Sequence, residues 1–223
     1  VPTPLCLAAA EGHWSVVQVL LQQGANPLFE CGDGITPLDT ASDGVRELMV
    51  LERLVAWRQW DRWDWSPLHH ACFAGSVDEV ASVLSGEAHQ DVAAATCQGV
   101  QALHIAAAVG VTDVVSALLE NGAEATAPDE LGLTAIHYAA ITGRWESLHL
   151  LLSEVQEMPS ARYGLTPLHC AAYTGQVNAA AVLLLAGASA SARTAAGQCP
   201  ADFARRSGSI ELMALLQASV SLA

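Results

Sequence analysis

A four-residue phrase recurs along the 223-residue chain and constrains the fold more than any other feature. It is most complete as Thr166-Pro167-Leu168-His169, and related phrases stand at intervals of 33, 30, 35, 33, 32 and 33 residues. The seven copies begin, in order, at Thr3, Thr36, Ser66, Gln101, Thr134, Thr166 and Cys199. Self-similarity at such a period is the signature of a repeat architecture, in which each unit packs against the next.

Each copy predicts a pair of helices. Thr166 is suited to cap the first helix, and Pro167 suits the first helical position, where no N–H is needed. Apolar residues three and four positions apart, as in Val114, Leu118 and Leu119, predict the second helix. Glycines that can adopt the left-handed conformation of a helix end follow the first helix. They are Gly12, Gly75, Gly110, Gly143, Gly175 and Gly208.

The combination of T-P-L-H, an alanine pair such as Ala171-Ala172, a glycine, a V-x-x-L-L run and Gly-Ala resembles the ankyrin repeat. The resemblance covers nearly the whole chain and implies an all-α fold, a solenoid of stacked helix–turn–helix units with short finger hairpins. We therefore expect a single ankyrin-repeat domain over residues 1–223. Its seven repeats would lie near 1–33, 34–64, 65–98, 99–131, 132–163, 164–196 and 197–223.

The second repeat departs from this pattern. Thr36 and Gly44 are eight residues apart rather than nine, and Val45 to Asp64 predicts one longer helix. Four tryptophans, Trp57, Trp60, Trp63 and Trp65, replace a normal finger. We expect a seam in the stack at 45–65. Its tryptophans either fill a gap in the packing or form an aromatic anchor for a partner.

Charge narrows the classes of partner. The net charge is −14, and between Trp65 and Ala192 twelve acidic residues face only two arginines, Arg144 and Arg162. Such a surface repels phosphate, so nucleic acid and anionic lipid are poor partners. It favours a protein with a basic or apolar contact surface, or it simply keeps the chain in solution. No stretch reaches the roughly 18 apolar residues of a membrane-spanning helix, so we expect no direct membrane insertion.

No pattern in the sequence predicts catalysis. The four histidines of the repeat phrase, at 69, 104, 137 and 169, follow the repeat spacing rather than a metal-ligand spacing; the ankyrin resemblance implies that they tie neighbouring repeats together. The six cysteines form no C-x-x-C pair, which favours reduced thiols in an intracellular compartment, the cytoplasm first and an organelle second. We expect no enzyme activity, no metal and no cofactor. Because Val1 opens at the edge of a repeat, we also expect a processed chain or part of a longer one.

The ankyrin resemblance places partner contacts at the finger tips and at the exposed end of each first helix. We predict a non-catalytic protein-binding module, an adaptor, scaffold or structural subunit of a hetero-complex, acting through its concave groove. The alternative is a docking or recruitment region of a larger enzyme or channel whose catalytic part lies outside this chain. Some candidate contact residues could instead pack repeat against repeat. The candidates are Trp57, Trp60, Trp65, Phe73, Val100, Leu131, Leu133, Ile141, Tyr163, Leu165 and Tyr173.

Overall fold

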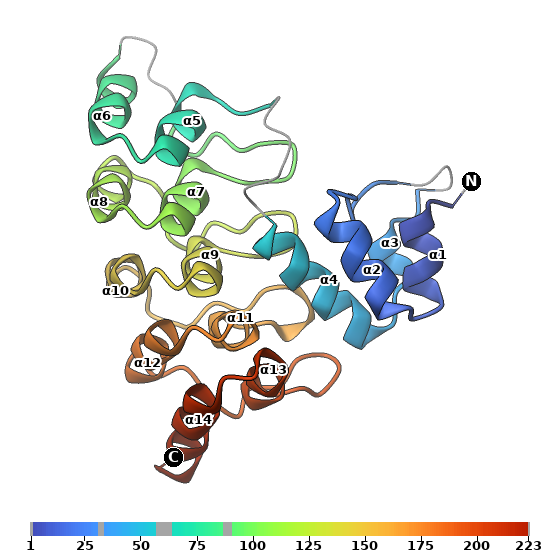
Figure 1. Ribbon diagram of the computed structural model, residues 1–223. Helices are drawn as coiled ribbons and strands as arrows, with labels where there is room; N and C mark the ends of the chain where they lie inside the picture. The colour runs from blue at the N-terminus through green and yellow to red at the C-terminus, as the bar shows by residue number, and fades with distance from the viewer. Residues whose placement is uncertain (1, 31–33, 57–63, 87–90, 223) are drawn as a thin grey trace. The chain divides into compact units, whose positions relative to one another are not determined.

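The described chain is built from α-helices. The computed structural model describes residues 2–30, 34–56, 64–86 and 91–222. Over these residues it contains fourteen α-helices, a short 3-10 turn at Arg162–Gly164 and one isolated β-bridge, between Ala95 and Gln101 (Figure 1). The predicted all-α repeat fold is confirmed. The helices are α1 (Pro4–Ala10), α2 (Trp14–Gln22), α3 (Pro37–Thr40), α4 (Asp43–Val55), α5 (Pro67–Ala74), α6 (Val77–Ser85), α7 (Ala102–Val109), α8 (Thr112–Glu120), α9 (Ala135–Thr142), α10 (Trp145–Ser153), α11 (Pro167–Thr174), α12 (Val177–Leu185), α13 (Pro200–Ser207) and α14 (Ile210–Leu222).

Two compact units account for the internal contacts of the chain. The first unit comprises Val1–Asp61 together with Arg193–Gln198, and the second comprises Arg62–Ala192 together with Cys199–Ala223. The predicted single domain and its seam at 45–65 stay predictions. Of the four tryptophans there, Trp57, Trp60 and Trp63 lie outside the described residues.

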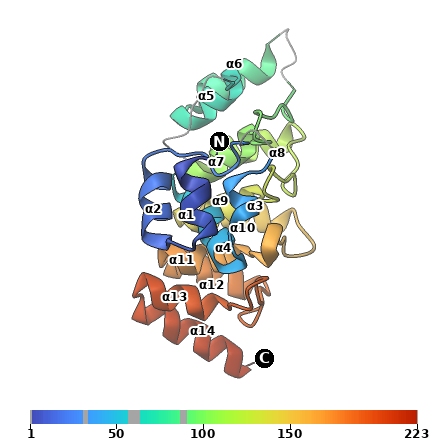
Figure 2. The same cartoon turned by 90° about the vertical axis from the view of Figure 1, so that its right-hand side faces the viewer.

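The second unit is a stack of five helix pairs. Its first helices (α5, α7, α9, α11 and α13) pack in that order as one row, and its second helices (α6, α8, α10, α12 and α14) pack as another. Figures 1 and 2 show the pairs following one another from α5–α6 to α13–α14. Buried alanine pairs, each residue at most 1% exposed, let neighbouring first helices approach closely. These pairs are Ala106-Ala107, Ala139-Ala140 and Ala171-Ala172.

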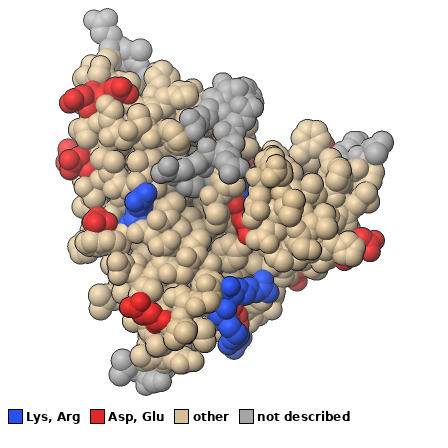
Figure 3. Space-filling model, in the orientation of Figure 1, with Lys and Arg blue, Asp and Glu red and all other residues tan. Residues whose placement is uncertain are grey.

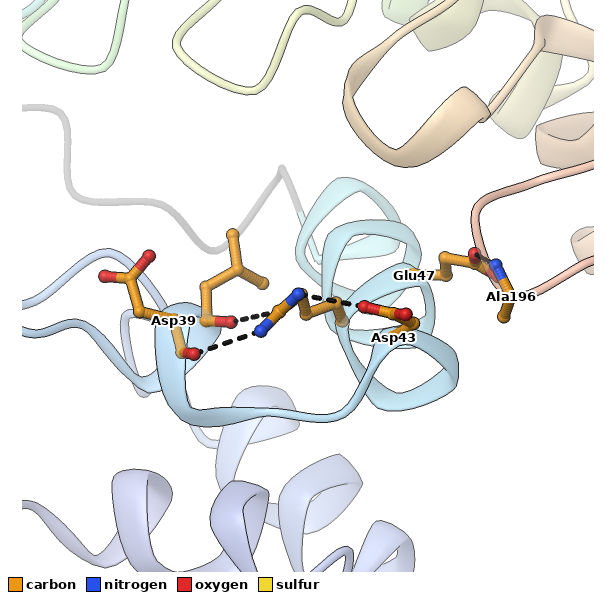
Figure 4. A network of polar contacts seen from close by, with 6 residues as sticks. Asp39, Asp43, Glu47 and Ala196 are labelled. Carbon is orange, nitrogen blue, oxygen red and sulfur yellow. Dashed lines mark hydrogen bonds and ion pairs between the residues drawn. The ribbon is translucent and has the colours of Figure 1, made fainter.

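Repeat two differs from its prediction in the bounds of its helices. The predicted helix from Val45 to Asp64 is wrong in its bounds, since α4 runs from Asp43 to Val55 and takes in Gly44. The preceding helix, α3, has only four residues. Arg46 donates to the carbonyls of Leu38 at 2.9 Å and Asp39 at 3.1 Å, and to the carboxylate of Asp43 at 2.9 Å (Figure 4). Its guanidinium thus satisfies carbonyls that a truncated helix leaves without partners, and it holds α3 against the first turn of α4.

Candidate protein-binding surface

The fingers, which the sequence predicts as short hairpins, are tight turns in the structure. In three fingers of the second unit, residues 96–100, 129–133 and 161–165, the first backbone N–H donates to the fifth carbonyl. The distances are 2.9 Å from Thr96 to Val100, 2.9 Å from Asp129 to Leu133, and 2.7 Å from Ala161 to Leu165. Each finger is therefore a closed five-residue turn.

Backbone hydrogen bonds join successive fingers. The N–H of Glu130 donates to the carbonyl of Gln98 at 3.1 Å, and the N–H of Arg162 donates to the carbonyl of Leu131 at 3.0 Å. Because both partners are backbone groups, the finger tips form a row with a fixed spacing.

One glycine tests how closely the fingers pack. Gly99 has φ +74°, and a Cβ there would lie 2.8 Å from the backbone nitrogen of Glu130 on the next finger. Gly197 occupies the same finger position with φ +77°, but a Cβ there would meet nothing within 4 Å. Left-handed backbone costs an alanine roughly 1–2 kcal/mol, and overpacking costs about 1–3 kcal/mol more.

Gly99→Ala is therefore expected to destabilise the protein by about 2–5 kcal/mol, and Gly197→Ala by only about 1–2 kcal/mol. Denaturant titration of the two purified variants measures the difference. Equal losses would show that the fingers are not packed backbone against backbone.

Asp129 organises the finger of residues 129–133 from within, although it is not among the residues predicted from the sequence. Its carboxylate is 5% exposed; Oδ1 accepts the N–H groups of Leu131 and Leu133 at 2.9 and 2.8 Å, and Oδ2 accepts the hydroxyl of Tyr138 at 3.0 Å. In the preceding finger the hydroxyl of Thr96 accepts the N–H of Val100 at 3.1 Å. Asp129 and Thr96 stand one repeat period apart, which is the signal that could have identified the position.

The histidines of the repeat phrase fix each finger to the helix beneath it. Nδ1 of His137 accepts the N–H of Thr134 at 3.1 Å, which leaves the ring proton on Nε2 to be donated to the carbonyl of Leu165 at 3.2 Å. His69 and His104 reach finger carbonyls in the same way, at 3.0 and 3.1 Å. Burial is the main cause of a lowered pKa in all three rings, and it brings the pKa of His137 to about 4. These contacts support a structural role for the histidines.

The candidate contact residues divide into two groups. Five are at most 3% exposed and pack inside the structure, the alternative that the sequence left open: Val100, Leu131, Leu133, Ile141 and Leu165. In each of the three fingers, the residue after the glycine is the fifth residue of the turn. Its carbonyl accepts the hydrogen bond that closes the turn, and its side chain is buried beneath the finger. Phe73, Tyr163 and Tyr173 remain half-exposed, and Trp65 is 9% exposed.

Rings beneath the half-exposed aromatic residues support them. The ring centroid of Phe73 lies 5.5 Å from that of Trp65, and Tyr173 lies 6.4 Å from the fully buried Phe203. Tyr163 is the aromatic residue of the finger of residues 161–165, and its φ is +63°. No other described non-glycine residue adopts this left-handed conformation. Such strain persists where the surrounding structure enforces it, and it clusters at functional sites. We call the finger tips and the adjoining ends of the first helices, with Phe73, Tyr163 and Tyr173, the aromatic face.

Carboxylates accompany the aromatic face. Glu130 is exposed in a finger, and Asp91, Glu124, Glu154 and Glu157 are exposed in the loops that lead to the fingers. On the side of the protein seen in Figure 3, acidic side chains are spread over the second helices from α6 towards α10, with one basic group among them, and further basic side chains lie near α13. The fingers and the loops that lead to them therefore carry several exposed carboxylates, with the exposed Arg162 beside Tyr163 among them.

The described residues contain no group of histidine, cysteine and carboxylate side chains that could hold a metal ion. Over the same residues, every helix is too short or too polar to cross a membrane. Among the described cysteines, those at 72, 97, 170 and 199 are free thiols.

Comparison with known proteins identifies the repeat. The pattern described as ankyrin repeats in three copies matches residues 43–129 and 125–194, and that of the single ankyrin repeat matches residues 3–30. The chain belongs to the ankyrin-repeat family. It therefore has the architecture of a protein-interaction module.

Individual relatives are functionally diverse. The chain is 33% identical over 87 residues to the probable 26S proteasome regulatory subunit p28 of Saccharomyces cerevisiae, covering 39% of this chain and 38% of that protein. It is 34% identical over 141 residues to the tyrosine-protein kinase HTK16 of Hydra vulgaris, covering 61% of this chain and 19% of the kinase. It is 49% identical over 39 residues to alpha-latrotoxin-Lh1a of Latrodectus hasselti, covering 18% of this chain and 3% of the toxin. The matches thus span well under half the length of each relative.

Proposed function

We propose that this chain is a non-catalytic adaptor, scaffold or structural subunit that holds a protein partner against the aromatic face. The observation that carries the proposal is a rigid row of fingers beside half-exposed aromatic side chains. Aromatic residues with a fixed position lose little conformational freedom on binding, and such residues supply much of the energy of protein interfaces.

The chemistry around this face indicates the kind of partner. Exposed carboxylates in the fingers and loops favour a partner whose apolar contact is bordered by basic side chains. The same charge disfavours nucleic acid.

The free thiols are in keeping with a reducing compartment, and we place the protein inside the cell, in the cytoplasm first. Similarity to a protein named as a proteasome regulatory subunit supports a place in a larger hetero-complex.

A second candidate function is docking within a larger enzyme. The match to the kinase HTK16 covers 61% of this chain but only 19% of the kinase, so a stack of this kind occurs as one region of a catalytic protein. The two functions differ in the size of the native polypeptide. An immunoblot of the native source separates them, because the docking function requires a chain much longer than 223 residues.

Removing two of the aromatic anchors tests the aromatic face. Phe73→Ala combined with Tyr173→Ala is expected to weaken partner binding about tenfold or more, because the contact loses both rings. The partner is first captured from the native source on the immobilised chain, and its affinity is then measured by calorimetry.

Trp145→Ala is the matched control, since Trp145 is 43% exposed at the start of α10 in the row of second helices. Circular dichroism and thermal midpoints establish that all variants are folded. If affinity survives the double change, or falls equally with Trp145→Ala, the aromatic face is not the binding surface.

A further inference from the structure

Two shallow apolar grooves lie side by side on the row of second helices, independent of the aromatic face. The larger has a volume of about 780 Å³ and lies between α12 and α14, with Leu184, Leu215 and Val220 in its lining. The smaller, of about 310 Å³, lies between α10 and α12, with Leu152 in its lining. Since α12 packs against both α10 and α14, the two grooves flank one helix.

Leu185 forms the ridge between the grooves. It lines both of them and is 90% exposed. The inward side of α12 is occupied by Ala179, Ala180 and Leu183, all at 0% exposure, so Leu185 projects from the opposite side. A single exposed leucine is ordinary. A leucine knob with an apolar groove on either side is the surface pattern of an interface.

The absence of charge at this surface points to its occupant. No Asp, Glu, Lys or Arg lines either groove, although the chain carries a net charge of −14 with histidine counted as neutral; His149 in the smaller groove is the one titratable side chain in the two linings. Two copies of so acidic a chain repel one another wherever their carboxylates meet, so an uncharged patch is where they can approach.

We propose that this face pairs with a second copy of the chain. Two-fold pairing requires one surface to carry both a protrusion and its matching recess. Leu185 is the protrusion, and the α12–α14 groove is the recess, so the Leu185 of each copy inserts into the groove of the other. The aromatic face is built from first helices and fingers, so each copy in the pair keeps it free for its own partner.

The size of the face makes the pairing weak. A nine-residue helix such as α12 is about 13 Å long and neighbouring helices lie about 10 Å apart, so three of them present roughly 300–400 Å². Stable complexes bury about 800 Å² on each partner. We therefore expect a dimer with a micromolar dissociation constant, visible only at high protein concentration.

Sedimentation velocity tests the pairing over a concentration series from about 5 to about 200 µM. The unmodified chain is expected to shift from monomer towards dimer. Leu185→Arg is expected to weaken the dimer at least tenfold, because the guanidinium would enter an apolar groove. This variant also makes the chain less negative, so loss of the dimer cannot be attributed to added like charge.

Ile210→Arg is the matched control. Ile210 is 83% exposed in the first turn of α14, lines neither groove, and undergoes the same change in charge. We expect it to dimerise like the unmodified chain. A chain that stays monomeric throughout, or a dimer equally sensitive to both changes, would overturn the proposal.

A photo-crosslinking residue in place of Ala186 locates the contact. The proposal requires a covalent dimer whose linked peptide includes α12 or α14 of the second copy; linkage to any other segment contradicts it. Flotation with phosphatidylcholine vesicles tests the other occupant of an uncharged apolar groove. Vesicle binding that Leu185→Arg abolishes, without any dimer, would assign the grooves to lipid and overturn the pairing.

Discussion

Replacing Asp129 by alanine is expected to lower the free energy of unfolding by about 3 kcal/mol or more. The carboxylate accepts two backbone N–H groups of its finger and the hydroxyl of Tyr138, and it is 5% exposed. Alanine leaves these donors buried without an acceptor, and each such donor costs about 1–3 kcal/mol. The measurement is the urea midpoint and slope of the purified variant.

Two variants separate the parts of this effect. Asp129→Thr places there the side chain that Thr96 uses to accept a finger N–H, so it is expected to recover more than half of the loss. Tyr138→Phe removes only the hydroxyl bond and is expected to cost about 1 kcal/mol. If Asp129→Thr lowers the free energy of unfolding as much as Asp129→Ala does, the hydrogen bonds to the finger are not the reason that Asp129 stabilises the protein.

Lowering the pH from about 7 to about 4 is expected to cost about 3 kcal/mol of stability through His137 alone. Burial lowers the pKa of His137 from 6.5 to about 4 in the folded protein. The unfolded chain therefore binds a proton at higher pH than the folded one does. The contribution of the neutral His137 to stability is fully present above pH 6.5 and is lost as the pH falls towards 4. The lowered pKa values of His69 and His104 act in the same direction.

His137→Gln isolates the effect of this one ring. The variant is less stable at pH 7 because it loses the fitted imidazole, but its stability should decline less between pH 7 and pH 4, by about 3 kcal/mol. Parallel pH profiles for His137→Gln and the unmodified chain would contradict the assignment. Denaturant titrations at several pH values give the profiles.

The periodic features of the fold could be predicted from the sequence. The phrase Thr-Pro-Leu-His places helix caps and ties between repeats, and Thr134 and His137 meet as that pattern requires. The truncated α3 could not be predicted, because it depends on Arg46 reaching back to the carbonyls of Leu38 and Asp39. That contact joins residues seven and eight apart and follows no repeat period.

The candidate surface was only partly predictable. Position within a repeat indicates which residues lie near a finger, but not which side of the finger they occupy. Leu133 and Leu165 were therefore grouped with Tyr163, although both are fully buried. The strain at Tyr163 is equally invisible in the sequence, because the neighbouring Gly164 already supplies a left-handed residue. Nothing in the sequence distinguishes Leu185 from the neighbouring Leu183 and Leu184.

Site-specific photo-crosslinking in cells of the native source tests most directly whether the aromatic face binds the partner. A benzophenone amino acid replaces Phe73, Tyr173 or, as the control, Trp145, and the linked proteins are identified by mass spectrometry. We expect positions 73 and 173 to capture the same partner protein and position 145 not to capture it. A partner captured only from position 145, or none captured from positions 73 and 173 while the protein is folded and expressed, would contradict this expectation.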